Sequence, residues 1–218
     1  MTKTPEMNAL RDRILTAALP NVLFDGWSRA ALTAGARSAG LTAEDVDVAF
    51  PRGVRDAMAH WLERADRNMV AAMKAADLDA MKIREKVAFG VRTRLEQASS
   101  HKEAVRRGLS YLALPGNTKL AASSLYRTVD HIWHACGDQS TDFNFYTKRG
   151  LLAAVYTSTL LYWLDDVSED HTDTWAFLDR RIADVMRVPR FTGRLKEVGA
   201  MLPNPMRVVR AFRRARHA

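Results

Sequence analysis

The stretch "STDFNFYTKRGLLAAVYTSTLLYWLDD", residues 140–166, decides the fold class. No residue from Gly150 to Leu164 is charged. A run of about fifteen residues spans about 22 Å as an α-helix, short of the roughly 30 Å of a bilayer core. We therefore predict a helix that is buried on most sides inside a globular protein. Ser140 or Thr141 is placed to cap its start.

The rest of the chain repeats the helical period, and no stretch alternates convincingly with period two. The clearest apolar stripe consists of Val54, Met58, Leu62, Ala65 and Met69. Pro20 is expected to bend or end the first helix, and Ser100 with Glu103 has capping-box spacing. The sequence predicts an all-α domain of about nine helices, followed by a C-terminal amphipathic helix.

Length and composition fit one domain plus a tail, since 218 residues can bury a hydrophobic core without disulfides or structural metal ions. The single cysteine, Cys136, excludes an intrachain disulfide and fits a reducing compartment. The first residues form neither an apolar secretory stretch nor an acid-free, Arg-rich transit peptide. We expect a cytoplasmic protein, bacterial in origin.

The positive charge is confined to one end of the chain. The net charge is +8, and residues 187–218 contain nine Lys or Arg and one Glu. Residues 1–186 are therefore neutral overall. A neutral body argues against nucleic-acid binding, because Lys and Arg contacts to phosphates supply most non-specific affinity.

Residues 28–50 have the shape of a helix-turn-helix, with Gly40 in the turn and Thr42 as a cap. The second helix exposes Glu44, Asp45 and Asp47, and no Lys or Arg follows until Arg52. Three carboxylates on a helix that has to approach phosphates make DNA reading unfavourable. We expect this part to be scaffold. A ligand-responsive transcriptional regulator is the alternative.

The segment "DHIWHACGD" groups His131, His134, Cys136 and Asp138. A metal site or a Cys-His nucleophile needs further ligands or partners, and no second pair with metal-ligand spacing exists. Phosphate-loop, GxSxG and HExxH motifs are also absent from the sequence. We therefore expect no catalytic residue, no metal and no cofactor.

The apolar run of residues 150–164 has two interpretations. It can be ordinary core, or it can line a ligand cavity. Hydroxyls from Tyr156 to Thr159 lie within the apolar run, and aromatic residues surround it, a combination found at sites for apolar ligands.

The tail "NPMRVVRAFRRARHA", residues 204–218, forms an amphipathic helix on a 100° wheel. A basic face opposite an apolar face with one aromatic residue is typical of helices that lie in a bilayer interface. A basic disordered end and a docking helix for another protein remain alternatives. The residues expected to contact the membrane are Met206, Arg207, Val209, Arg210, Phe212, Arg213 and Arg214.

The motifs "AALPNVLFDGW" and "GDQSTDFNFYTKRGLLAAVYTSTLLYWLDDVSEDHTDTWAFLDRRIADVM" resemble the ubiquinone (coenzyme Q) biosynthesis accessory lipid-binding family, often called Coq-nine. The resemblance covers residues 10–187. It implies a TetR-like fold that does not read DNA, a homodimer and a bound isoprenoid lipid or quinone intermediate. It also implies a protein partner, the di-iron demethoxyubiquinone hydroxylase.

The resemblance implies site residues and a domain division as well. The lipid would contact Trp133, Phe145, Tyr146, Leu152, Val155, Tyr156 and Leu160. The hydroxylase would bind around Asp173, Trp175 and Leu178. We expect a degenerate helix-turn-helix at 1–50, a lipid-binding core at 51–188, and a hinge with a membrane-binding tail at 189–218. The expected protein is non-enzymatic and peripheral on the inner membrane.

Overall fold

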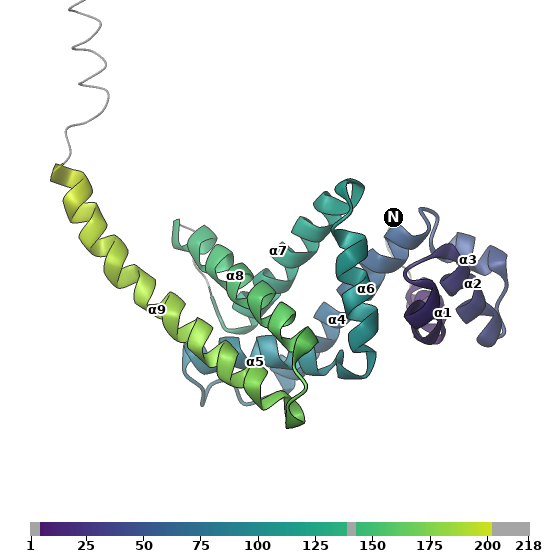
Figure 1. Cartoon of the computed structure of the whole chain (residues 1–218), viewed down its shortest axis with the longest axis horizontal. Coiled ribbons are helices and arrows are strands. Elements are labelled where there is room, and N and C mark those ends of the chain that lie inside the picture. The colour runs from purple at the N-terminus through teal and green to yellow at the C-terminus, as the bar shows by residue number, and fades with distance from the viewer. Residues whose placement is uncertain (1–4, 139–142, 202–218) are drawn as a thin grey trace, which may run out of the picture. The chain divides into compact units, whose positions relative to one another are not determined.

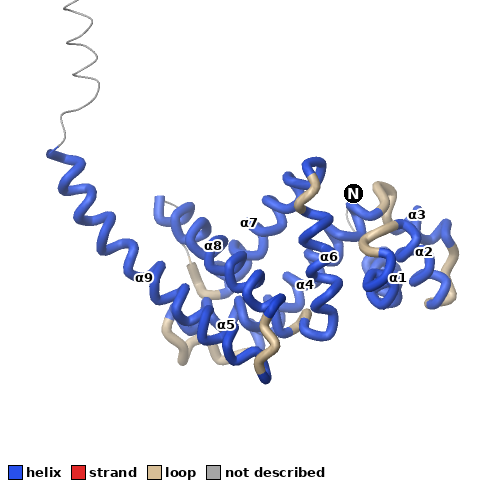
Figure 2. The backbone as a smooth tube through the Cα atoms, in the orientation of Figure 1, coloured by secondary structure: helices blue, strands red, loops and turns tan. Residues whose placement is uncertain are grey.

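The computed structural model describes residues 5–138 and 143–201, and the described part contains nine α-helices and no strand (Figures 1 and 2). The helices are α1 Pro5–Asp25, α2 Arg29–Ser38, α3 Ala43–Ala49, α4 Val54–Ala75, α5 Ile83–Glu96, α6 Lys102–Leu112, α7 Thr118–Ala135, α8 Phe143–Asp165 and α9 Thr172–Met201. The all-α prediction is confirmed. The chain forms two compact units, residues 1–178 and 179–218, and α9 begins in the first and continues in the second.

Helices α1, α2 and α3 gather at one end of the first unit (Figure 1). Their core contains Ile14, Leu15 and Leu32, each at most 1% exposed. α1 and α2 approach closely at Gly35, where an added Cβ would lie 2.5 Å from the Ala18 Cα atom. This contact requires glycine, because no side chain fits between the two backbones.

The three-helix end is joined to α6 by a tryptophan. The Trp27 indole donates a 3.0 Å hydrogen bond to the Ala104 carbonyl oxygen, and its ring lies 4.8 Å from that of Trp61. Gly108 of α6 lies beside both rings. One aromatic cluster therefore connects the beginning of the chain to the rest of the first unit.

Two expected helix boundaries were wrong. α1 continues through Pro20 to Asp25, although proline removes one hydrogen bond to Thr16. Buried contacts on both sides of the proline, at Leu19 and Val22, outweigh that loss. Ser100 lies in a 3₁₀ turn, and α6 begins only at Lys102 without a side-chain cap.

α9 is helical through Pro189 to Met201, across the stretch that we expected to form a hinge. The domain division that we expected from the sequence remains a prediction. Residues 204–218, which contain every expected membrane contact, lie outside the described residues.

Candidate functional site

α8 turns an apolar face into the first unit. Leu152 and Val155 are 3% exposed, and Tyr156 and Leu160 are 8% exposed. Burial raises the pKa of the Tyr156 hydroxyl, nearby Arg94 lowers it and Asp66 raises it, so the net shift is upward and the group stays protonated. Four of the expected lipid contacts thus share one buried helix face.

The other three expected lipid contacts lie at the α7–α8 corner. Phe145 is half-buried with the Arg149 guanidinium 3.4 Å from its ring centre, and Tyr146 is 69% exposed. The Trp133 indole donates to the Lys148 carbonyl oxygen at 3.2 Å. Ten residues of helix separate Phe145 from Val155, about 15 Å. The structure therefore divides the expected set into two groups.

Three buried polar atoms, one on α7 and two on α8, have no hydrogen-bond partner among the described residues. They are Ser124 Oγ, Thr159 Oγ1 and Trp163 Nε1, on residues that are 4%, 0% and 0% exposed. An unpaired buried polar group costs about 1–3 kcal/mol. The sequence contained the signal for two of them, since Thr159 and Trp163 continue the spacing of Leu152 and Val155 along the buried face.

The carboxylate of Asp66, which is 0% exposed, joins three helices. It accepts hydrogen bonds from Arg94 Nε of α5 at 3.3 Å, from Arg127 Nε of α7 at 2.9 Å and from the Thr128 hydroxyl at 2.8 Å. Sequence reasoning missed this cluster, because charges inside helices normally face solvent. Its partners neutralise the carboxylate and fix α4 against α5 and α7.

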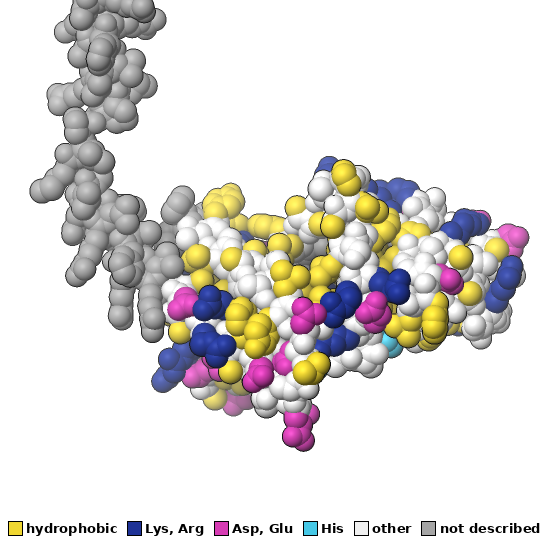
Figure 3. Space-filling model, in the orientation of Figure 1, with side chains coloured by type: hydrophobic (Ala, Val, Ile, Leu, Met, Phe, Trp, Pro, Cys, Tyr) yellow, Lys and Arg dark blue, Asp and Glu magenta, His cyan; other side chains and the backbone are white. Residues whose placement is uncertain are grey.

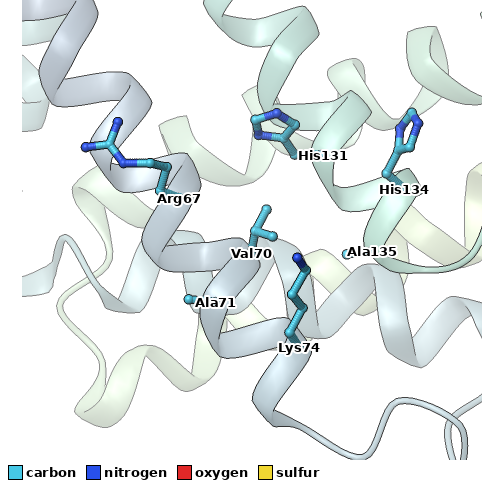
Figure 4. A pocket seen from close by; sticks show the side chains of 7 residues that line it. All are labelled: Arg67, Val70, Ala71, Lys74, His131, His134 and Ala135. Carbon is cyan, nitrogen blue, oxygen red and sulfur yellow. The ribbon is translucent and has the colours of Figure 1, made fainter. Parts of the chain in front are cut away.

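A cavity of about 440 Å³ lies between α4 and α7 (Figure 4). Its lining consists of Arg67, Val70, Ala71, Lys74, His131, His134 and Ala135. None of the expected lipid contacts lines this cavity. The lining residues recur every three or four positions on each helix, so each helix presents a single face to the space.

The residues considered for a metal site do not converge. Cys136 is 7% exposed, and burial raises the pKa of its thiol to about 11, despite Lys86. Asp138 pairs with Lys148 at 2.7 Å and with Arg149 at 3.3 Å. Among residues 5–138 and 143–201, no three His, Cys, Asp or Glu side chains form a group that could hold a metal ion.

The α8–α9 connection positions the expected partner surface. Burial alone would raise the pKa of Asp166, but hydrogen bonds from Ser168 and Thr174 lower it well below the usual range. Asp170 and His171 have φ angles of 50° and 57°, in the left-handed region that side chains disfavour. The Trp175 indole donates to the Asp170 carbonyl oxygen at 2.8 Å. This turn therefore fixes the tryptophan.

The three expected partner residues differ in exposure. Asp173 is exposed, Trp175 is half-buried and Leu178 is 2% exposed. The Arg92 guanidinium lies 4.9 Å from the Trp175 ring centre. Leu178 packs inside, so it supports this surface from beneath.

The helix-turn-helix region is built as expected, and its acidic residues are partly neutralised. Thr42 caps α3 and forms a capping box with Asp45. Asp47 pairs with Arg29 of α2. On the side that Figure 3 shows, charges of both signs are interspersed with hydrophobic side chains. No helix in the described part of the chain is long and apolar enough to span a membrane.

The fold is similar to that of TetR regulators. The crystal structure of a TetR transcriptional regulator from Nitrosomonas europaea aligns with a TM-score of 0.68 over 82% of this chain and 98% of that one. The two sequences are 18% identical, so this likeness shows the fold alone. The TetR-like prediction is confirmed.

A family model described as COQ9 matches residues 118–189. The human "Ubiquinone biosynthesis protein COQ9, mitochondrial" is 36% identical over 200 residues, which are 88% of this chain and 63% of that protein. A Drosophila melanogaster protein of the same name is 31% identical over 190 residues, 85% of this chain and 58% of its own length. The "Probable ubiquinone biosynthesis protein coq9, mitochondrial" of Dictyostelium discoideum is 28% identical over 194 residues, 86% of this chain and 63% of that one.

The chain is similar to COQ9 proteins over most of its length, as its sequence motifs indicated. It spans 63% of the length of the human relative.

Proposed function

We propose that this chain is a non-enzymatic accessory protein of ubiquinone biosynthesis. It binds an isoprenoid quinone intermediate and presents it to the di-iron demethoxyubiquinone hydroxylase. The supporting observation is the similarity to COQ9 proteins over 88% of the chain, together with the COQ9 family model over residues 118–189, which include α8. The protein acts as a homodimer and needs no cofactor of its own.

The unpaired polar atoms on α8 support quinone binding. A quinone ring has oxygen atoms on an otherwise apolar molecule, and the Trp163 N–H and the Thr159 hydroxyl are able to hydrogen-bond such oxygens. Pairing them would remove the cost of leaving them buried without partners. Because Leu152 and Val155 are closely packed, we expect α8 to shift when the prenyl chain enters.

Membrane docking follows from the chemistry of the ligand. Exposing a prenyl chain to water costs about 0.8 kcal/mol per methylene group, whereas transfer from a bilayer to an apolar protein interior is nearly neutral. Loading therefore requires the protein to sit on the membrane. We assign this step to residues 203–218, with the basic face on anionic lipid and the apolar face in the interface.

Partner binding is assigned to the α8–α9 turn. Trp175 is held by Asp170 and by Arg92, so its orientation is fixed before a partner arrives. Tryptophan is enriched among residues that dominate binding energy, and a rigid ring loses little entropy on binding. Asp173 is exposed beside it.

Native mass spectrometry of the full chain tests lipid binding. We expect one isoprenoid quinone per protomer. Thr159→Val should lower quinone affinity roughly tenfold, the effect of losing one hydrogen bond of about 1.4 kcal/mol. Because that hydroxyl has no partner in the structure, the same change should leave the stability of the empty protein unchanged or raise it by about 1 kcal/mol.

Ala154→Trp, on the exposed side of α8, is the matched control for Val155→Trp on the buried side. Val155→Trp should abolish quinone binding, and Ala154→Trp should retain it. Equal retention by both would disprove the assignment to α8. Liposome flotation with and without residues 203–218 tests docking, and equal flotation of the two forms would remove the membrane role.

A further inference from the structure

The α4–α7 cavity has no part in the function proposed above. Val70, Ala71 and Ala135 supply its apolar surface, while Arg67 and Lys74 are exposed beside them on α4. Its volume of about 440 Å³ lies in the range of small-molecule sites, roughly 300–1,000 Å³. It has the size for a compact ligand.

The charge of the lining is all of one sign. Arg67 and Lys74 contribute two cations, and none of the residues that line the cavity is acidic. Within the part of the chain that the structure describes, neither cation is found in an ion pair or a side-chain hydrogen bond.

The acidic side chains on neighbouring turns of the two helices are Glu63, Asp66 and Asp130, and Glu63 already has Arg127 at 3.9 Å. Asp66 is bound by Arg94 and Arg127, and Asp130 accepts a 2.6 Å hydrogen bond from Arg149 Nε. These carboxylates have partners of their own, so the cavity keeps a net positive charge. A positive, concave surface attracts anions.

Two imidazoles complete the polar part of the lining. The Nδ1 atom of His131 is buried and has no hydrogen-bond partner among the described residues. The Nδ1 atom of His134 lies 3.2 Å from the Asp130 carbonyl oxygen and 3.5 Å from the Asp130 carboxylate, which leaves Nε2 of that ring for another partner. A ligand oxygen would reach the His131 ring through Nε2, which is not among the buried nitrogen atoms.

From this geometry we infer that the α4–α7 cavity binds a small amphiphilic anion. Lys74 and His131 hold an oxyanion head, either carboxylate or phosphate, Arg67 adds positive charge at the edge of the cavity, and a short chain or ring lies over Val70, Ala71 and Ala135 (Figure 4). The apolar surface explains why an inorganic anion alone is a poor fit. The cationic side chains explain why an uncharged molecule of the same shape is a poor fit as well.

The test is a titration of the ¹⁵N-labelled full chain with octanoate and octyl phosphate, followed by amide chemical shifts. Octanol, octylammonium and inorganic phosphate are the matched probes. We expect saturable shifts in residues 67–74 and 131–135 with one or both amphiphilic anions, and at least tenfold weaker binding of each control probe. The two anions distinguish a carboxylate from a phosphate head.

Arg67→Ala with Lys74→Ala should weaken binding of the anion tenfold or more, since hydrogen bonds to charged groups are strong. Ala71→Trp should block the cavity while keeping both cations. Arg37→Ala with Lys119→Ala removes the same charge from exposed positions outside the cavity and should leave binding unchanged.

Octanol or phosphate binding as tightly as the amphiphilic anions would overturn the inference, as would shifts that never saturate or that map elsewhere. Equal weakening by the Arg37 and Lys119 control would overturn it too. None of these outcomes bears on quinone binding at α8, so the two proposals stand or fall separately.

Discussion

Replacing Asp66 by alanine should destabilise the protein more than the loss of an ordinary charged residue. The Asp66 side chain is 0% exposed and that of Arg94 is 8% exposed. Without the carboxylate, the Arg94 guanidinium remains buried with no carboxylate of its own. Breaking a buried pair in this way costs about 3–5 kcal/mol.

The other two partners of Asp66 lose less. Arg127 is 27% exposed and keeps Glu63 at 3.9 Å, and the Thr128 hydroxyl can turn its proton to the Ser124 carbonyl oxygen, 3.0 Å away. We therefore assign the whole loss to Arg94. For a domain of this size, about 3–5 kcal/mol corresponds to a fall in Tm of roughly 6–20 °C.

Urea unfolding followed by circular dichroism measures the effect. Adding Arg94→Met to Asp66→Ala should recover about 2 kcal/mol, because the stranded charge is removed. Glu96→Ala is the control, since its pair with Arg92 is solvent-exposed and such pairs are worth about 0.5 kcal/mol. A loss below 1 kcal/mol for Asp66→Ala, or a double variant no more stable than the single one, would refute this reasoning.

Three further predictions concern stability and reactivity. Gly35→Ala should lower the free energy of unfolding by about 1–3 kcal/mol, because the new Cβ would lie 2.5 Å from Ala18. Gly150→Ala is the control in the same urea assay: its Cβ would meet nothing within 4 Å, so the change should be neutral or stabilising. Cys136 should react with a thiol reagent far more slowly in the native protein than in urea at pH 7.5, since its pKa is raised to about 11; equal rates would contradict its burial. Because the pKa of Asp166 is lowered in the folded protein, its ionised carboxylate stabilises the fold at pH values above the ordinary pKa of Asp. This contribution is lost as the pH falls below about 4. Asp166→Asn should therefore lower the free energy of unfolding by about 1.5–3 kcal/mol at pH 7. The variant should also lose less stability than the wild type as the pH falls below about 4. Parallel curves of unfolding free energy against pH for the two proteins would show that the pKa shift is absent.

Much of the fold could be predicted because the helical period is strong. The uncharged run from Gly150 to Leu164 does lie in a long helix, and Thr42 does cap α3. Boundaries were less predictable. Proline normally ends a helix, but α1 continues through Pro20 because the residues around it are buried. Ser100 was expected to cap a helix, but it lies in a 3₁₀ turn. Propensity at one residue is worth a few kcal/mol at most, and packing can exceed it.

The candidate site was harder to predict than the fold. The resemblance singled out Leu152, Val155 and Leu160, and the structure buries all three on one face of α8. Neither the resemblance nor the helical period says which residues α8 packs against. Asp66 and Arg94 are 28 positions apart in the sequence, and only tertiary contact makes them a pair. The α4–α7 cavity likewise depends on two helices brought together by the chain between them.

The Trp27 indole bonded to Ala104 bears on how this protein can be shortened. Cutting the chain after Phe50 would strip the cover from Ala57 and Met58, both 0% exposed, and would leave Trp61 without its aromatic neighbour. The remaining fragment would expose these hydrophobic side chains to water and should aggregate. The first fifty residues are thus needed to cover the core of the first unit, whatever other function they have.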